Sequence, residues 1–180
     1  MVATSSEHAA CARCGDCCRS VRVPVTGADL SRLAAPDAAA LLSYLEWLAP
    51  SDVDMTGEPE TWVRLPEGRR LLVLRHGADG CCFLEANCCS VYRRRPAACQ
   101  AYPYCLGSGL GQDLVQRMEG VSCHSHPRVL SLEALRAHAT ELHDYAERVQ
   151  QWNRRQRRRL RFRLRPESPA AFLRFVAIVA

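Results

Sequence analysis

The sequence predicts a helix-rich α+β fold: a small metal-organised domain with a short β-hairpin, followed by a long C-terminal amphipathic helix. Three observations predict it. The chain of 180 residues has 11 cysteines and few aromatic side chains. A turn at 66–68 separates two short apolar segments, and apolar residues recur at a helical period after residue 131. We therefore expect a cysteine-rich domain at residues 1–126 and a helical, Arg-rich extension packed on it at 127–180.

The N-terminal part predicts an extended segment and two helices. Residues 21–25 alternate valine with other residues and favour an extended chain. Thr26 is the predicted N-cap of a short helix, and Asp29 follows three residues later as in a capping box. A second helix is predicted from Pro36 to Pro50. Its apolar residues fall at helical spacing: Leu41, Leu42, Leu45 and Leu48.

Residues 51–105 predict short strands and one further helix. The segment 51–60 is polar and is predicted as a loop. Residues 62–65 and 71–75 flank the turn Pro66-Glu67-Gly68, which is typical of a hairpin. Two more extended pieces are expected at 82–84 and 90–92, each beside a cysteine pair. Pro96 is expected to open a helix that carries Cys99, and the glycines within 106–113 predict a loop.

A long amphipathic helix is predicted from Ser131 to Arg159. Its stripe repeats every seven residues, with two aromatic residues offset by three: Leu135, Leu142, Val149, Tyr145 and Trp152. Beyond it, Arg161 to Arg165 alternates arginine with apolar residues and predicts a strand. Ser168-Pro169 is expected to cap a short apolar helix.

The charge is unevenly distributed. All 24 basic residues are arginine, which excludes a lysine nucleophile or Schiff base. Residues 1–153 carry 15 Arg against 18 acidic residues, a net charge of −3, whereas residues 154–180 carry 9 Arg against one Glu, a net charge of +8. Eight arginines in Arg154–Arg165 indicate a contact with nucleic acid or an acidic protein. A solvated helix end is the competing interpretation, because cations are favourable there.

The sequence favours a cytoplasmic protein. The first ten residues lack the basic and apolar regions of a secretory signal, and no apolar run approaches the roughly 18 residues of a membrane span. In a reducing compartment, cysteines act as metal ligands more often than as disulfides. The phosphate-loop, radical-SAM, G-x-S-x-G and H-E-x-x-H motifs are absent from the sequence.

The cysteines form two groups. The first is Cys11-x2-Cys14-x2-Cys17-Cys18, and the second spreads over Cys81, Cys82, Cys88, Cys89 and Cys99, with Cys105 and Cys123 beyond. A C-x2-C spacing turns two sulfurs toward one centre and recurs in zinc knuckles and iron–sulfur loops. The overlapping C-x2-C units favour an iron–sulfur cluster, although a bacterial ferredoxin would continue with x3-C-P. Zinc stays open. Because adjacent side chains diverge, one of Cys17 and Cys18 is a candidate ligand for a second centre.

These residues resemble the YkgJ-type cysteine-cluster family, also written CxxCxxCC, described as a zinc- or iron-chelating domain. Its pattern continues through G-x-C-x-F-L and C-x-[IV]-Y-x-x-R-P-x-x-C to a last cysteine. The resemblance covers residues 11–123 and implies these metal ligands: Cys11, Cys14, Cys17, Cys18, Cys81, Cys89, Cys99 and Cys123. Cys82 and Cys88 double the expected single cysteines, so ligand choice within each pair stays open. Cys105, His124 and His126 have no assigned role, although the histidines could add a nitrogen ligand.

Three functions are compatible with this sequence. The first is a metal-binding module holding an iron–sulfur cluster, expected as [4Fe–4S], or Zn²⁺. The second is an accessory or catalytic component of a methylation-like protein modification or a redox reaction, because a flagellin lysine N-methylase resembles this module. The third is a nucleic-acid-associated protein that uses the Arg-rich tail. No catalytic residue is assigned.

Overall fold

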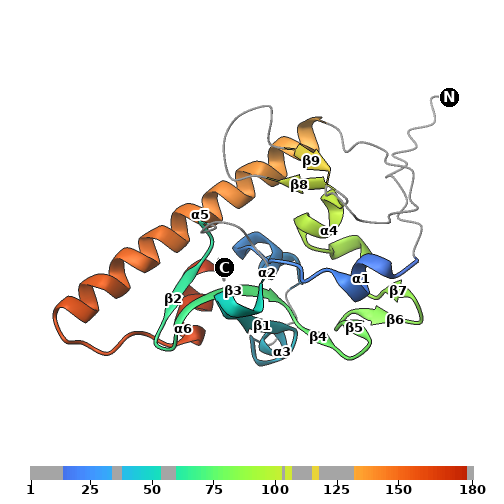
Figure 1. The fold of residues 1–180 in the computed structure, drawn as a ribbon. Helices are drawn as coiled ribbons and strands as arrows, with labels where there is room; N and C mark the ends of the chain where they lie inside the picture. The colour runs from blue at the N-terminus through green and yellow to red at the C-terminus, as the bar shows by residue number, and fades with distance from the viewer. Residues whose placement is uncertain are drawn as a thin grey trace.

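The structure, a computed structural model, describes residues 14–33, 38–53, 60–102, 104–106, 115–117 and 132–177 (Figure 1). Its helices are α1 (Asp16–Ser20), α2 (Gly27–Leu33), α3 (Ala38–Ser43), α4 (Ala97–Ala101), α5 (Leu132–Arg161) and α6 (Pro169–Val176), with 3-10 turns η1 (Pro50–Asp52) and η2 (Tyr92–Arg94). Its strands are β1 (Leu45–Leu48), β2 (Val63–Leu65), β3 (Gly68–Leu74), β4 (His76–Gly77), β5 (Gly80–Cys81), β6 (Leu84–Glu85), β7 (Cys88–Cys89), β8 (Tyr104–Leu106) and β9 (Val115–Arg117). The architecture is α+β.

The largest sheet has the antiparallel order β1-β3-β2. Leu65 pairs with Gly68, so Pro66 and Glu67 form the turn of the predicted hairpin, which is confirmed. The extended segment 21–25 is also confirmed: its Pro24 bridges Val73 of β3. The predicted capping box of α2 is present as well. The backbone N–H of Thr26 donates to Asp29 Oδ2 at 2.8 Å, and that of Asp29 donates to Thr26 Oγ1 at 3.2 Å.

The predicted second helix is wrong in its C-terminal half. The helix ends at Ser43, and Leu45–Leu48 forms β1, paired with β3 from Leu45↔Leu74 to Leu48↔Leu71. Leu45 and Leu48 are buried in the strand, and a helix would have buried them too. Their spacing alone therefore does not distinguish a helix from a strand. The pairing with β3 favours the strand because it provides hydrogen-bond partners for the backbone N–H and C=O groups of β1. Pro36 lies outside the described residues.

The cysteine pairs lie on two small hairpins, β4–β5 and β6–β7. Leu84 of the expected extended piece 82–84 is in β6, but Cys82 and Phe83 form a turn. The piece expected at 90–92 is wrong, because the chain turns there and enters η2 at Tyr92. Ala86 and Asn87 have positive φ angles of 46° and 64°, and this tight turn closes β6–β7 two residues earlier than expected.

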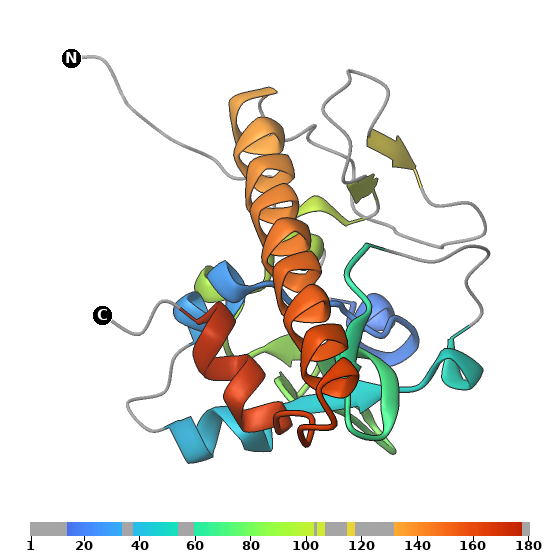
Figure 2. The same ribbon diagram turned by 90° about the vertical axis from the view of Figure 1, so that its left-hand side faces the viewer.

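The predicted long helix is confirmed as α5, and three of its five stripe residues face the core; Leu142 is half-buried, and the Leu135 side chain lies outside the described part of the chain. Tyr145, Val149 and Trp152 are buried there. Phe172 of α6, which is fully buried, packs edge-on against the Trp152 ring at a centroid distance of 5.3 Å. Figure 2 shows α6 lying beside α5. The predicted cap of α6 is confirmed, since the Ala171 N–H donates to Ser168 Oγ at 3.3 Å.

α5 also covers the outer edge of β2. The indole N–H of Trp152 donates to the Arg64 carbonyl at 2.9 Å. The Asn153 amide accepts from the Arg64 N–H at 2.7 Å and donates to the Trp62 carbonyl at 2.7 Å. These three side-chain hydrogen bonds replace those of a neighbouring strand.

The strand predicted from Arg161 to Arg165 is wrong. The helix continues through Arg161 and ends in a tight cap in which Arg163 has a φ of 56°. No described helix is long and apolar enough to cross a membrane. The domain boundary predicted at 126/127 falls outside the described residues and stays a prediction.

Candidate metal centre

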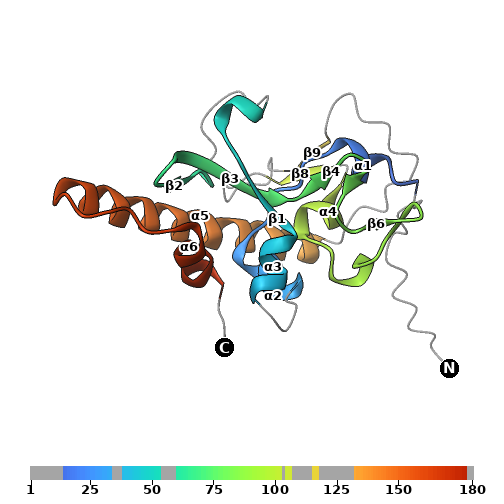
Figure 3. The same cartoon turned by 90° about the horizontal axis from the view of Figure 1, so that it is seen from below.

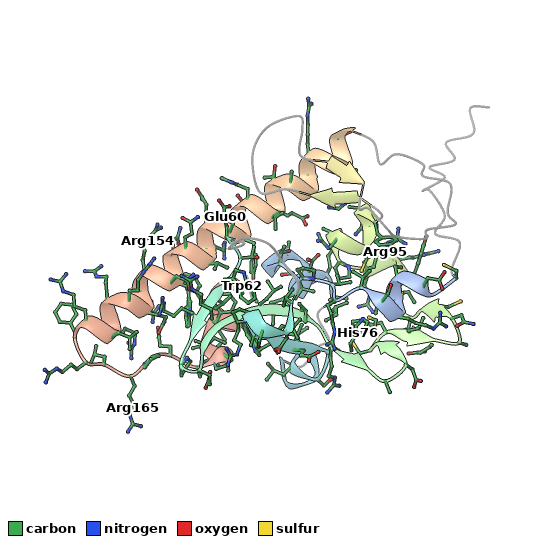
Figure 4. All side chains as sticks on the ribbon, in the orientation of Figure 1. Glu60, Trp62, His76, Arg95, Arg154 and Arg165 are labelled. Atoms are coloured by element: carbon green, nitrogen blue, oxygen red, sulfur yellow. The ribbon has the colours of Figure 1, made fainter. Side chains whose placement is uncertain are left out.

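The described cysteine sulfurs gather at one end of the molecule, around α1 and β5–β7 (Figure 4). The cysteines whose side chains are described are Cys14, Cys17, Cys18, Cys81, Cys82, Cys88, Cys89 and Cys99. Of the other predicted ligands, Cys11 and Cys123 lie outside the described residues, as do His124 and His126. Cys105 is described only as a backbone position in β8.

The two cysteine groups meet where α1 packs against β5. Gly80 has a φ of 117°, a conformation that favours glycine. A Cβ at this position would lie 2.6 Å from the Cys18 carbonyl oxygen and 3.0 Å from the Arg19 Cα. The absence of a side chain therefore allows the backbone of Cys18 to approach that of Gly80, although 62 positions separate them in the chain.

The Cys18 thiol is more acidic than an ordinary cysteine thiol. A hydrogen bond with Cys17, whose sulfur lies 4.0 Å away, lowers the pKa of Cys18 to about 7. Burial opposes this effect, and the guanidinium groups of Arg19 and Arg95 add to it. Arg95 itself stacks on the Tyr92 ring at 4.1 Å. A substantial fraction of Cys18 is therefore thiolate near neutral pH, and the thiolate is the form that binds metal.

Four thiols from four different elements are electrostatic neighbours. Burial raises the pKa of Cys99, and the charges of Cys81, Cys89 and Cys18 raise it further. Burial also raises the pKa of Cys89, with contributions from Cys18 and Cys81. The pKa of Cys81 is raised chiefly by its hydrogen bond with Cys82 and then by burial, with a smaller contribution from the Cys18 charge. Because each thiolate disfavours the others, a cation is needed to hold all four deprotonated.

Cys82 and Cys88, the sequence neighbours of Cys81 and Cys89, lie in different surroundings. Cys88 is exposed to solvent. The Cys82 thiol donates to the Tyr44 carbonyl at 3.7 Å, and its pKa is lowered by the hydrogen bond with Cys81 and the charge of Arg75. Cys81 and Cys89 thus share a charge interaction with Cys18, and the choice of ligand within each pair stays a prediction.

Arg19 connects α1 to the β6–β7 hairpin. Its guanidinium donates to the Asn87 side-chain oxygen in the turn of that hairpin and to the Cys14 carbonyl at 3.1 Å. This one side chain thus joins the first cysteine group to the hairpin that ends in Cys89. It also supplies positive charge beside Cys18.

Asp29 positions α4, the helix that carries Cys99. Its carboxylate is 1% exposed and accepts from the Ala97 N–H at 2.9 Å, in the first turn of α4. Arg32 donates to the same carboxylate and, at 2.7 Å, to both carboxylate oxygens of Glu141 on α5. α2, α4 and α5 are therefore joined through one buried polar network.

Cysteine thiolates suit a thiophilic metal, but the described cysteines do not form a closed coordination shell. Among the residues that the structure describes, no three His, Cys, Asp or Glu side chains are arranged to hold one ion. The fit rests on thiolate chemistry and on the charge interactions among Cys18, Cys81, Cys89 and Cys99.

A family model named CxxCxxCC, "Putative zinc- or iron-chelating domain", matches residues 10–124. The chain belongs to this family. The predicted resemblance is thereby confirmed, and the family description supports metal binding without choosing between zinc and iron. No curated protein and no solved structure matches the chain. Membership in the CxxCxxCC family therefore identifies the class of site and leaves its biochemical role to be proposed.

Sequence reasoning missed two residues near this CxxCxxCC site. Asp29 was predicted only as a cap, because nothing in its spacing indicates the contact with Ala97, 68 positions away. His76 pairs with Cys81 across β4–β5, and its Nε2 is buried without a hydrogen-bond partner among the described residues. Burial, followed by the charge of Arg22, lowers the pKa of His76. Nothing in the sequence around His76 indicated that this histidine would lie beside a cysteine.

Proposed function

We propose that the protein binds a thiolate-ligated metal centre that organises its cysteine-rich domain. The proposed ligands come from both cysteine groups: Cys11, Cys14, Cys17, Cys18, Cys81, Cys89, Cys99 and Cys123. The observation that carries the proposal is the gathering of the described cysteine sulfurs at one end of the molecule (Figure 4), where Cys18, Cys81, Cys89 and Cys99 influence one another's charge. Four mutually repelling thiolates gain stability together only when a cation neutralises them.

An iron–sulfur cluster, [4Fe–4S] in type, is the first candidate for this centre. It is supported by the overlapping C-x2-C units of the first group. Arg19 and Arg95 lie close enough to Cys18 to lower its pKa, and positive charge of this kind offsets the net negative charge of a thiolate-bound cluster. When bound, the cluster would supply one-electron redox chemistry or a purely structural link.

Zinc is the second candidate because of one distance. The Cys17 and Cys18 sulfurs are 4.0 Å apart, whereas the sequence predicted divergent side chains serving different centres. Ligand sulfurs at the corners of a tetrahedral zinc site are about 3.8 Å apart, from a Zn–S bond of about 2.3 Å. The observed separation therefore suits two thiolates on one ion.

Anaerobic purification followed by metal analysis and an optical spectrum tests the proposal. Stoichiometric iron and sulfide with a broad visible band would identify the cluster, and a colourless protein with stoichiometric zinc would identify the ion. A protein that carries neither metal would contradict the proposal. So would metal-free protein that melts cooperatively at the midpoint of the metal-loaded protein, because the metal would then not organise the domain.

Paired variants test the ligand assignment within the same preparation. We expect Cys89→Ser to lose bound metal, because its thiol interacts with Cys18 and Cys81. We expect the matched control Cys88→Ser to keep its metal, because Cys88 is exposed. Equal metal content in the two variants would contradict the assignment of Cys89.

A further inference from the structure

The C-terminal end of α5 extends beyond the β2–β3 hairpin and α6, away from the cysteine end of the molecule (Figures 1 and 3). We call residues Leu160–Arg165, the last turn of the helix and its cap, the α5 tip. In Figure 4 the labelled Arg154 and Arg165 lie at this end, with their side chains directed away from the body.

The tip exposes apolar side chains that a soluble domain would ordinarily bury. Leu160 is 47% exposed, Phe162 is 68% exposed and Leu164 is 51% exposed. Among the described residues, the only other large hydrophobic side chain of this kind is Leu42. Three of the four therefore lie within five consecutive positions, which marks a contact surface rather than scattered exposure.

The same tip is strongly basic. Arg161, Arg163 and Arg165 alternate with the apolar side chains and are exposed. The segment 154–165 has eight arginines and no acidic residue. Among the described residues, the ion pair seen for this segment joins Arg155 to Glu167 at 2.5 Å. Most of the positive charge is therefore available to a partner.

The backbone of the tip is held in one conformation. The Leu164 N–H donates to the Arg159 carbonyl at 2.9 Å, and the Arg163 N–H donates to the Leu160 carbonyl at 3.0 Å. This is the Schellman pattern, with Arg163 at the left-handed position that glycine usually occupies. In that motif the residue after the left-handed position commonly packs back on the helix, whereas Leu164 is exposed. The turn thus presents Leu164 outward.

We propose that the α5 tip docks on a lipid membrane surface that carries anionic headgroups. The three apolar side chains would enter the interface between headgroups and acyl chains, and the arginines around them would bind phosphates. A nucleic acid would use the arginines and the Phe162 ring but would leave Leu160 and Leu164 without a partner. A second copy of this chain would bring two clusters of positive charge together. An acidic protein would need an apolar groove matched to this one turn, whereas an anionic membrane offers phosphates and an apolar interior over its whole surface.

Vesicle co-sedimentation of the full-length, metal-loaded protein tests the proposal. The probes are vesicles of phosphatidylcholine with about one quarter phosphatidylglycerol, and vesicles of phosphatidylcholine alone. We expect binding to the anionic vesicles that weakens with salt, and at least tenfold weaker binding to the neutral ones. The variant Leu160→Ser/Phe162→Ser/Leu164→Ser keeps every charge, and we expect it to bind the anionic vesicles at least tenfold more weakly.

Matched controls separate this surface from general charge and from misfolding. Arg161→Gln/Arg165→Gln should weaken vesicle binding, whereas Arg136→Gln/Arg174→Gln, which removes as much exposed charge elsewhere, should not. Leu42→Ser is the control for an exposed leucine, and unchanged melting midpoints show that the variants fold. Unchanged vesicle binding by the triple serine variant would overturn the proposal. So would tight binding to single-stranded nucleic acid without vesicle binding, or self-association that the triple variant abolishes.

Discussion

Gly80 is the residue on which the approach of α1 to β5 depends, and its replacement gives a sharp test. We expect Gly80→Ala to lower the free energy of unfolding by about 1–3 kcal/mol, because the new Cβ would meet the Cys18 carbonyl at 2.6 Å and because φ is 117°. Bound metal should fall with it. The measurements are chemical denaturation and metal content.

Gly77 is the matched control for this substitution. It lies in the paired strand, has no positive φ, and a Cβ there would meet its nearest atom at 4.0 Å. Gly77→Ala should therefore leave metal content unchanged. If both alanine variants kept their metal equally, close packing at Gly80 would not matter for the centre.

His138 is the residue that predicts a pH dependence. It is 8% exposed, its Nδ1 has no hydrogen-bond partner among the described residues, and burial lowers its pKa from 6.5. Asp29, Arg32 and Glu141 are its charged neighbours. Below about pH 6.5 the unfolded chain binds a proton that the folded chain resists, so stability falls as the pH falls.

The corresponding variant isolates this contribution. The loss of unfolding free energy between pH 7 and pH 5.5 should be smaller in His138→Gln than in the wild type, as measured by urea denaturation at each pH. His143→Gln is the control, because His143 lies on the same helix with a 37% exposed side chain. An identical pH dependence in the wild type and His138→Gln would refute the assignment.

At the scale of elements, the cap of α5 predicts a stabilising substitution. Arg163 adopts a φ of 56°, which costs about 1 kcal/mol in a residue with a side chain. Arg163→Gly should therefore raise the free energy of unfolding by about that amount. Arg161→Gly removes the same charge from a helical position and should lower stability by about 1 kcal/mol. Thermal melts distinguish the two, and a destabilised Arg163→Gly would contradict the cap.

Elements set by local chemistry were predictable from the sequence. The Thr26–Asp29 capping box, the hairpin around Pro66-Glu67 and the stripe of α5 each depend on residues close in the chain. Leu45–Leu48 was mispredicted because apolar residues three apart fit a helix as well as this strand. The cap at Arg163 was mispredicted because alternating residues resemble a strand when the helix end is unknown.

The candidate site was predictable in composition and less so in arrangement. The spacing of the cysteines and the family pattern indicated a candidate ligand set, and six of its eight cysteines have described side chains. The proposed choice of Cys89 over Cys88, and the contacts of Arg19 with Asn87 and of Asp29 with Ala97, depend on folding of distant segments. No spacing rule encodes them.

At the scale of the whole molecule, the Asp29 network joins the cysteine end to the long helix. Asp29→Asn removes the buried negative charge that accepts hydrogen bonds from Arg32 and from the Ala97 N–H. We expect this change to lower the free energy of unfolding by about 3 kcal/mol. Metal affinity should also fall, because α4 carries Cys99. Denaturation and metal titration of the same samples measure both effects.

The surface pair Asp16–Arg19 supplies the control for that prediction. Its atoms are 3.9 Å apart and both side chains are more than 40% exposed. Asp16→Asn should change stability by no more than about 0.5 kcal/mol. Comparable losses in the two aspartate variants would show that Asp29 has no special structural role.

The contacts of Trp152 and Asn153 with β2 have a consequence during synthesis. Residues 60–74 emerge from the ribosome well before residues 152 and 153, so a hairpin formed in that interval would have its Arg64 edge uncovered. An uncovered edge can pair with a strand of another nascent chain. The arrival of α5 ends that interval, and the helix therefore serves as a built-in guard against aggregation for the strand made before it.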